Sequence, residues 1–121
     1  MVLRMLVDEN IPGAESALAS FGRVQRFSGR SLTRSQLIDT DVLLVRSVTT
    51  VNEALLSGTP VRFVGSATSG IDHIDVSYLQ DCGIHFAHAG GANANSVVEY
   101  VLSAIAAVGD RLERLLAGET C

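Results

Sequence analysis

Residues 42–49 read Val42-Leu43-Leu44-Val45-Arg46-Ser47-Val48-Thr49, four apolar residues followed at once by an arginine and a serine. The apolar run predicts a strand, and Arg46 and Ser47 then stand together at the edge of a sheet. Similar short runs recur along the chain, and with residues 42–45 the predicted strands are 3–7, 23–27, 42–45, 61–64 and 84–86. Helical patterns alternate with these runs, as in βαβ units. The expected fold is α/β, an open doubly wound parallel sheet of about five βα units.

Helices are predicted between and after these strands. Residues 14–21 have helix-compatible apolar spacing. Thr50 and Glu53 have the spacing of a capping box, which predicts a helix over residues 50–56 with Thr50 as its N-cap. A long helical pattern begins at Ala94, with apolar residues on one face.

The composition describes one globular domain over residues 1–121, with 47% hydrophobic and 18% charged residues. A net charge of −4 argues against nucleic acid or an anionic membrane as the main partner. All nine basic residues are arginines, which excludes a lysine Schiff base and a P-loop lysine. Arginine forks remain available for a carboxylate or a phosphate.

The two cysteines and the apolar segments bear on the cellular location. Cys82 and Cys121 have no spacing typical of a disulfide framework or a zinc site, so a reducing compartment is expected. The most apolar stretch, residues 97–108, is too short for a membrane span, which needs about 20 residues. The chain start lacks the pattern of a signal sequence. A cytoplasmic, soluble protein is therefore expected.

Polar loops follow four of the predicted strands, at residues 8–10, 46–49, 66–70 and 88–93. Ligands of open parallel sheets bind beyond the carboxyl ends of the strands, so a cleft is expected there. Two interpretations of Arg46 stay open: it binds a carboxylate or phosphate with Ser47, or it pairs with a nearby acid. The loop at residues 66–70 is either an anion nest or a helix cap.

Several familiar motifs are absent. Residues 65–70 lack the lysine of a phosphate-binding loop, and no GxGxxG dinucleotide fingerprint occurs in the chain. The three histidines do not have zinc-site spacing: they are His73, His85 and His88. A triad of Ser47, His73 and Asp75 has no nucleophile elbow to support it. No metal site and no hydrolase are predicted.

Four motifs together resemble the D-isomer-specific 2-hydroxyacid dehydrogenase family. They are residues 6–12, residues 44–49, residues 63–68 followed by Asp72-His73, and residues 93–101. The Asp-Glu-Asn and Arg-Ser-Val-Thr motifs within them resemble the branch of that family that acts on 4-phospho-D-erythronate. The resemblance extends from the first strand to about Val108.

The resemblance implies an NAD-dependent oxidation of 4-phospho-D-erythronate at its 2-hydroxyl, a step in pyridoxal 5'-phosphate biosynthesis. It identifies this chain as the flavodoxin-like, N-terminal substrate-binding domain. Family members are much longer, and their dinucleotide-binding domain carries the catalytic residues and most of the NAD contacts. The chain alone is therefore expected to be inactive, as part of a cytoplasmic enzyme that is a homodimer at full length.

The resemblance also implies roles for individual residues. Those matching substrate-binding positions are Ser47, Thr68, Arg46, Gly70 and Asn93, and Val97 matches an apolar contact to the nicotinamide ring. The run Ala89-Gly90-Gly91-Ala92-Asn93 departs from the family's Ala-Pro-Gly-Cys-Asn. The competing hypothesis is a stand-alone flavodoxin-like module that binds a small anion or a protein partner without catalysis.

Overall fold

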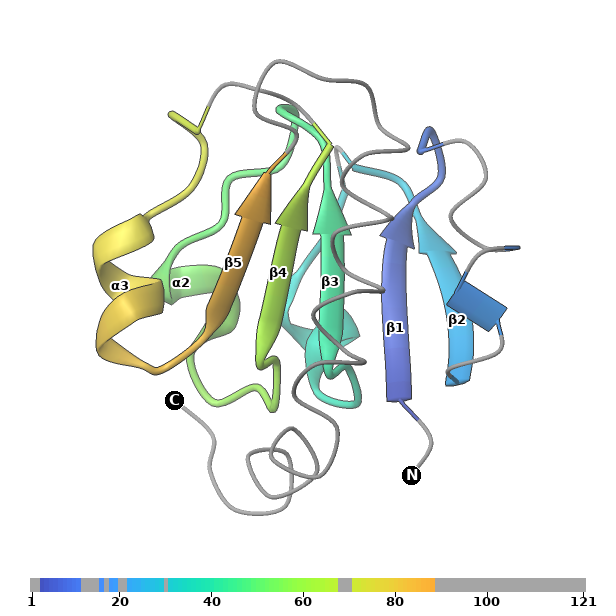
Figure 1. The fold of residues 1–121 in the computed structure, drawn as a ribbon, viewed down its shortest axis with the longest axis horizontal. Helices are drawn as coiled ribbons and strands as arrows, with labels where there is room; N and C mark the ends of the chain where they lie inside the picture. Colours follow the sequence, from blue (N-terminus) through green and yellow to red (C-terminus); the bar gives the residue numbers. More distant parts are fainter. Residues whose placement is uncertain are drawn as a thin grey trace.

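Five parallel strands form one sheet in the computed structural model, which describes residues 3–11, 16, 18, 19, 22–29, 31–67 and 71–88. The strands are β1 (Leu3–Asp8), β2 (Gly22–Phe27), β3 (Val42–Val45), β4 (Phe63–Ser66) and β5 (His85–His88). Their order is β2-β1-β3-β4-β5, and all five arrows point the same way (Figure 1). This is the strand order of flavodoxin-like doubly wound sheets. The predicted fold class is confirmed.

The central strand β3 explains why the sheet forms from this sequence. Successive side chains of a strand point to opposite faces, and all four residues of β3 are at most 1% exposed. Both faces of the sheet are therefore covered at its centre, as expected for a parallel sheet. On one face, Leu43 and Val45 belong to a core cluster with residues from the helices.

Three short helices lie within the described ranges. They are the 3-10 helix η2 (Arg34–Leu37) and the α-helices α2 (Glu53–Leu56) and α3 (Val76–Asp81). Their buried leucines, Leu37, Leu55, Leu56 and Leu79, join the core cluster. Figure 1 shows α3 beside β5, the strand at one end of the sheet.

The fourth strand begins two residues later than predicted. Val61 is fully buried in the core, but the ladder to β3 pairs Val42 with Phe63 and ends with Val45 and Ser66. The backbone N–H of Arg62 instead donates to the carbonyl of Asp41 before the ladder starts. The apolar run correctly indicated that residues 61–64 are buried, but the pairing with β3 decided where the strand begins and ends. Ser66 is thus the last strand residue, not the first loop residue.

The predicted N-cap of the second helix is wrong. Helix α2 begins at Glu53, and the side chain of Asn52 accepts a hydrogen bond from the Leu55 N–H at 3.1 Å. Val51 forms an isolated parallel bridge with Ile74, so the chain is still extended there and Thr50 lies outside the helix. Tertiary pairing of Val51 therefore displaced the helix start from Thr50 to Asn52.

The remaining predictions concern two helices, the cysteines and membrane-spanning segments. The helix predicted at residues 14–21 falls mostly outside the described residues, and the one from Ala94 falls wholly outside them. Cys82 is disulfide-bonded, although the spacing of the cysteines did not indicate a disulfide framework. Among the described residues no helix is long and apolar enough to cross a membrane.

Candidate functional site

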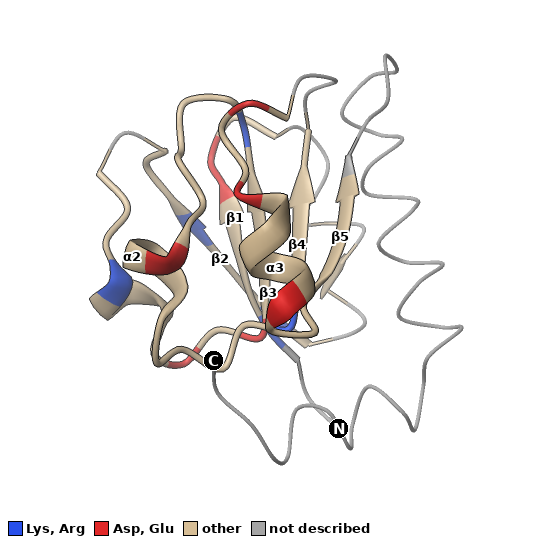
Figure 2. Ribbon diagram, turned by 90° about the vertical axis from the view of Figure 1, so that its left-hand side faces the viewer, with Lys and Arg blue, Asp and Glu red and all other residues tan. Residues whose placement is uncertain are grey.

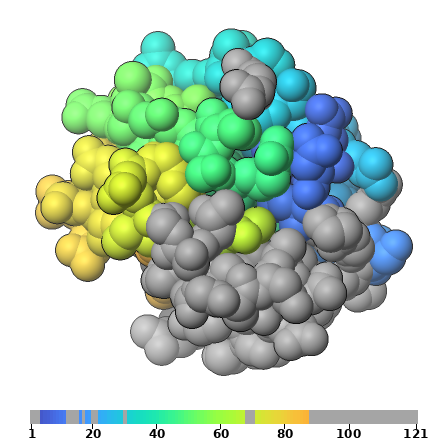
Figure 3. All heavy atoms as spheres, turned by 90° about the horizontal axis from the view of Figure 1, so that it is seen from above, coloured from blue at the N-terminus to red at the C-terminus, as the bar shows by residue number. Residues whose placement is uncertain are grey.

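The strand order reverses between β1 and β3, which lie side by side although β2 comes between them in the sequence. In open α/β sheets such a switch point opens a crevice at the carboxyl ends of the strands, where ligands bind. Figure 3 looks down on this end, and the segments after β1 (blue), β3 (green) and β4 (yellow-green) meet there. The polar loops predicted after these strands begin at this end of the sheet.

Asp8 and Arg46 meet at this switch point. Asp8 ends β1 and Arg46 follows β3, and the Arg46 Nε donates to Asp8 Oδ1 at 3.0 Å. The Asp8 side chain is 0% exposed, whereas that of Arg46 is 32% exposed. Figure 2 shows acidic and basic segments adjoining at this upper end of the sheet. The ion pair that the sequence left as an alternative is present.

The ion pair uses only one of the nitrogens of Arg46. Within the part of the chain that the structure describes, neither Nη group of Arg46 has a hydrogen-bond partner. A guanidinium offers five N–H donors in a fixed fork, and a pair through Nε leaves the four Nη hydrogens for another acceptor. Pairing with Asp8 and binding of an anion are therefore compatible in this geometry.

Ser47 follows Arg46 in a turn closed by a hydrogen bond from the Thr49 N–H to the Arg46 carbonyl at 3.3 Å. The residue is exposed, and its hydroxyl has no partner among the described residues. Ser47 thus offers an exposed hydroxyl directly after the partly exposed Arg46 in the chain. Each of these two groups can donate a hydrogen bond to an anion.

The carboxyl end of β4 carries a pair that the sequence did not reveal. Ser66 Oγ lies 2.9 Å from His73 Nε2, and Ser66 is fully buried. Burial lowers the pKa of His73 below its usual value, and the neighbouring Asp72 carboxylate opposes this shift. Burial therefore favours the neutral form of the imidazole. The sequence placed Ser66 in the candidate loop 66–70, but no local signal indicated its contact with His73, which depends on the fold.

The rejected serine-histidine-acid triad is also absent from the structure. His73 contacts Ser66, not Ser47, and the Asp75 carboxylate accepts a hydrogen bond from the Tyr78 N–H at the start of α3. Asp75 is therefore a helix N-cap. No group of three potential metal ligands occurs among the described residues.

Four predicted site residues lie outside the described residues: Thr68, Gly70, Asn93 and Val97. Their roles stay predictions. Of the six residues assigned from the resemblance, the structure therefore describes Arg46 and Ser47.

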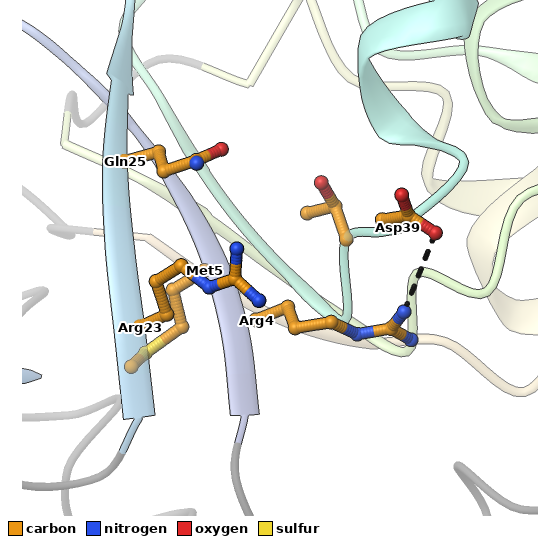
Figure 4. Close-up of a pocket in the computed structure, with 6 residues that line it drawn as sticks. Arg4, Met5, Arg23, Gln25 and Asp39 are labelled. Carbon is orange, nitrogen blue, oxygen red and sulfur yellow. Dashed lines mark ion pairs between the residues drawn. The ribbon is translucent and has the colours of Figure 1, made fainter.

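A cavity of about 390 Å³ lies at the opposite end of the sheet (Figure 4). Its lining residues come from β1, β2 and the segment before β3: Arg4, Met5, Arg23, Gln25, Asp39 and Thr40. Arg4 donates to Asp41 through Nη2 at 2.9 Å and Nε at 3.2 Å, and lies 3.5 Å from Asp39. The hydrogen bond to Asp41 raises the pKa of Arg4. Asp41 and Asp39 therefore already compensate the charge of Arg4 within the protein.

Comparison with known proteins extends these observations. Residues 6–117 match the family model "D-isomer specific 2-hydroxyacid dehydrogenase, catalytic domain". The chain is 57% identical over 103 residues to an erythronate-4-phosphate dehydrogenase of Salinibacter ruber, covering 85% of this chain and 26% of that protein. It is 51% identical over 109 residues to an erythronate-4-phosphate dehydrogenase of Yersinia pestis, covering 90% of this chain and 29% of that protein.

Solved structures agree on the fold. A D-lactate dehydrogenase from Aquifex aeolicus, complexed with NAD and lactic acid, superposes with a TM-score of 0.64 at 21% identity. The match covers 98% of this chain and 39% of that protein. The chain thus spans between a quarter and a third of the curated relatives named above. The switch-point geometry and the family match over most of the chain agree: the protein belongs to the D-isomer specific 2-hydroxyacid dehydrogenase family.

Proposed function

We propose that this chain is the substrate-binding domain of an NAD-dependent dehydrogenase that oxidises 4-phospho-D-erythronate at its 2-hydroxyl. The product is 2-oxo-3-hydroxy-4-phosphobutanoate, and the step serves pyridoxal 5'-phosphate biosynthesis. The observation that carries the proposal is Arg46, held through Nε with both Nη groups free of described partners, beside the exposed Ser47. The names of the two curated relatives support the choice of substrate.

In this proposal Arg46 and Ser47 bind one anionic end of the substrate. A guanidinium fork matches the oxygen geometry of phosphate or carboxylate, and a hydroxyl adds a further donor. Thr68, Asn93 and the amides around Gly70 are proposed to complete the contacts. Amino-acid side chains do not accept a hydride, so the proposed role of these groups is binding and orientation of the substrate.

NAD is the proposed cofactor and would accept the hydride from C2 of the substrate. The sequence contains no GxGxxG fingerprint, so most of the NAD contacts are assigned to a dinucleotide-binding domain. Val97 is the one residue of this chain proposed to contact the nicotinamide ring. We propose that the enzyme is cytoplasmic and homodimeric, and that the 121-residue chain by itself does not turn over substrate.

Calorimetry on the chain tests the binding role. We expect 4-phospho-D-erythronate to bind more tightly than D-erythronate, because only the phosphorylated acid offers a second anionic group. Arg46→Lys and Ser47→Ala should each weaken its binding about fivefold or more, since a hydrogen bond to a charged group is lost. Exposed residues on other elements provide matched controls, Arg34→Lys and Ser77→Ala.

The two competing hypotheses separate in the same experiment. Equal affinity for the phosphorylated and unphosphorylated acids, unaffected by Arg46→Lys, would contradict the proposed substrate site. Binding of inorganic phosphate alone, with no preference for the hydroxy acid, would favour the stand-alone anion-binding module instead.

A further inference from the structure

Gly29 lies against the buried carboxylate that holds Arg46. A Cβ atom added at Gly29 would lie 2.4 Å from Asp8 Oδ2 and 2.7 Å from Val48 Cγ2. Real Cβ contacts are not this short, so any other residue here must displace the carboxylate or the loop. Gly29 has no positive φ, unlike Gly58 and Gly83. The position therefore requires glycine for space and not for backbone conformation.

The contact with Gly29 confines the oxygen of Asp8 that hydrogen bonds do not hold. Asp8 Oδ1 accepts from the Asn10 N–H at 2.8 Å and from Arg46 Nε at 3.0 Å. Asp8 Oδ2 is buried and has no hydrogen-bond partner among the described residues. A carboxylate bonded through one oxygen only still rotates about its bonds. The close approach of Gly29 limits that rotation on the other side.

Thr49 keeps the Gly29 segment in place. Its hydroxyl donates to the Gly29 carbonyl at 2.8 Å, and Thr49 is only 4% exposed. Thr49 lies three residues after Arg46, so the segments that follow β2 and β3 are tied together. Asp8, at the end of β1, is enclosed between them. Three neighbouring strands thus contribute to the position of one guanidinium.

We infer that Gly29 is a positioning residue for the anion site. By confining the Asp8 carboxylate, it sets where Arg46 Nε is held and so directs both Nη groups to the substrate anion. The inference rests on the proposed function for the identity of that anion. The placement of Arg46 itself does not depend on the substrate, so the two are separable by experiment.

A second role for Asp8 makes the opposite prediction. If Asp8 served only to neutralise Arg46, displacing its carboxylate would release the guanidinium and strengthen anion binding. If Asp8 and Gly29 position Arg46, the same displacement weakens anion binding. Gly29→Ala distinguishes the two roles because it moves the carboxylate without changing any charge.

The experiment measures the dissociation constant of inorganic phosphate and the NMR signal of Arg46 Nε–Hε, assigned by its loss in Arg46→Lys. Gly29→Ala should shift that signal and raise the phosphate dissociation constant about tenfold, since small misplacements of binding groups are costly. In the Arg46→Lys background Gly29→Ala should have no further effect on phosphate. A control is Gly83→Ala, which strains the backbone at a φ of +69° but has no atom within 4 Å of the added Cβ. It should lower stability and leave phosphate binding unchanged.

Thr49→Val provides a second variant should Gly29→Ala fail to fold. It removes the hydrogen bond to the Gly29 carbonyl with little change in side-chain volume and should weaken phosphate binding a few-fold, again only when Arg46 is present. Unchanged or tighter phosphate binding in Gly29→Ala overturns the inference. If Gly29→Ala does not fold, the same result in Thr49→Val overturns it. If wild-type chain does not bind phosphate, the proposed function fails, while the Arg46 signal in Gly29→Ala still decides the positioning role.

Discussion

Two arginine–aspartate pairs lie at opposite ends of the same sheet and are built differently. At the amino end, Arg4 donates to Asp41 through its backbone N–H, Nε and Nη2. At the carboxyl end, Arg46 donates to Asp8 through Nε alone. The first guanidinium is committed to the fold, whereas the second keeps its Nη groups for another acceptor. The same two residue types thus form a structural clamp in one place and hold a candidate binding group in the other.

Removal of Asp41 should have the largest effect on stability. Asp41 is 4% exposed and accepts three hydrogen bonds from Arg4, so Asp41→Ala should lower the free energy of unfolding by about 3 kcal/mol. Urea denaturation measures this change. Asp39→Ala is the matched control, because its 85% exposed side chain contacts Arg4 only at 3.5 Å, and it should cost less than about 0.5 kcal/mol. Similar losses for both variants would contradict the clamp.

A charge-conserving substitution at each arginine should separate the two ends by function. A lysine ammonium lacks the planar fork of a guanidinium, so it cannot donate from Nε to Asp8 and present a separate pair of nitrogens to an external anion. Arg46→Lys should therefore weaken phosphate binding by about 1.4 kcal/mol, or tenfold. Arg4→Lys should lower stability by about 1 kcal/mol and leave phosphate affinity unchanged. Phosphate affinity that falls equally in both variants would show that the ends are not distinct.

Helix α2 provides a control in which the stability of the fold changes while the candidate site stays intact. The Asn52 side chain caps α2, so Asn52→Ala should cost about 1 kcal/mol in thermal or urea unfolding. Thr50→Ala, outside the helix, should cost little. Neither variant should alter phosphate binding. This result would show that lower stability alone does not weaken phosphate binding as Arg46→Lys does. If Thr50→Ala lowered the free energy of unfolding more than Asn52→Ala, Thr50 would be the N-cap, as the sequence predicted.

The smallest expected effect is a dependence of stability on pH, caused by His73 near the carboxyl end of the sheet. Because burial lowers the pKa of His73 in the folded state, the unfolded chain binds the proton more tightly. Stability from this group is present above the unfolded value of about 6.5 and is lost as pH falls through the lower folded value. The melting temperature should therefore drop modestly between pH 7 and pH 5.

His73→Gln keeps a partner for Ser66 but does not titrate, so it should flatten this part of the pH profile. The pKa of Arg4 is raised by its hydrogen bond to Asp41, so Arg4 stays charged throughout the range and adds no pH dependence there. An identical drop in wild type and His73→Gln would assign the pH dependence to other groups.

The sequence by itself determined the class of fold and placed Arg46 and Ser47 at the carboxyl end of a buried strand, where the candidate site lies. Apolar runs such as residues 42–45 have to be buried, and parallel strands with helical crossovers are the arrangement that buries them on both faces. The polar residues after each run then meet at one edge. Arg46 and Ser47 were identified as candidates because both follow the same buried strand.

Only the tertiary structure decided the features that depend on residues distant in sequence. The pairing of Val51 with Ile74 moved the start of α2 to Asn52, and pairing with β3 moved β4 to end at Ser66. Local patterns carry no information about such partners. The same holds for Gly29, whose contact with Asp8 involves a residue 21 positions away in the chain. Its contact with Asp8 exists because three parallel strands bring residues 8, 29 and 46–49 to one point, and that convergence is a property of strand order, not of any local segment.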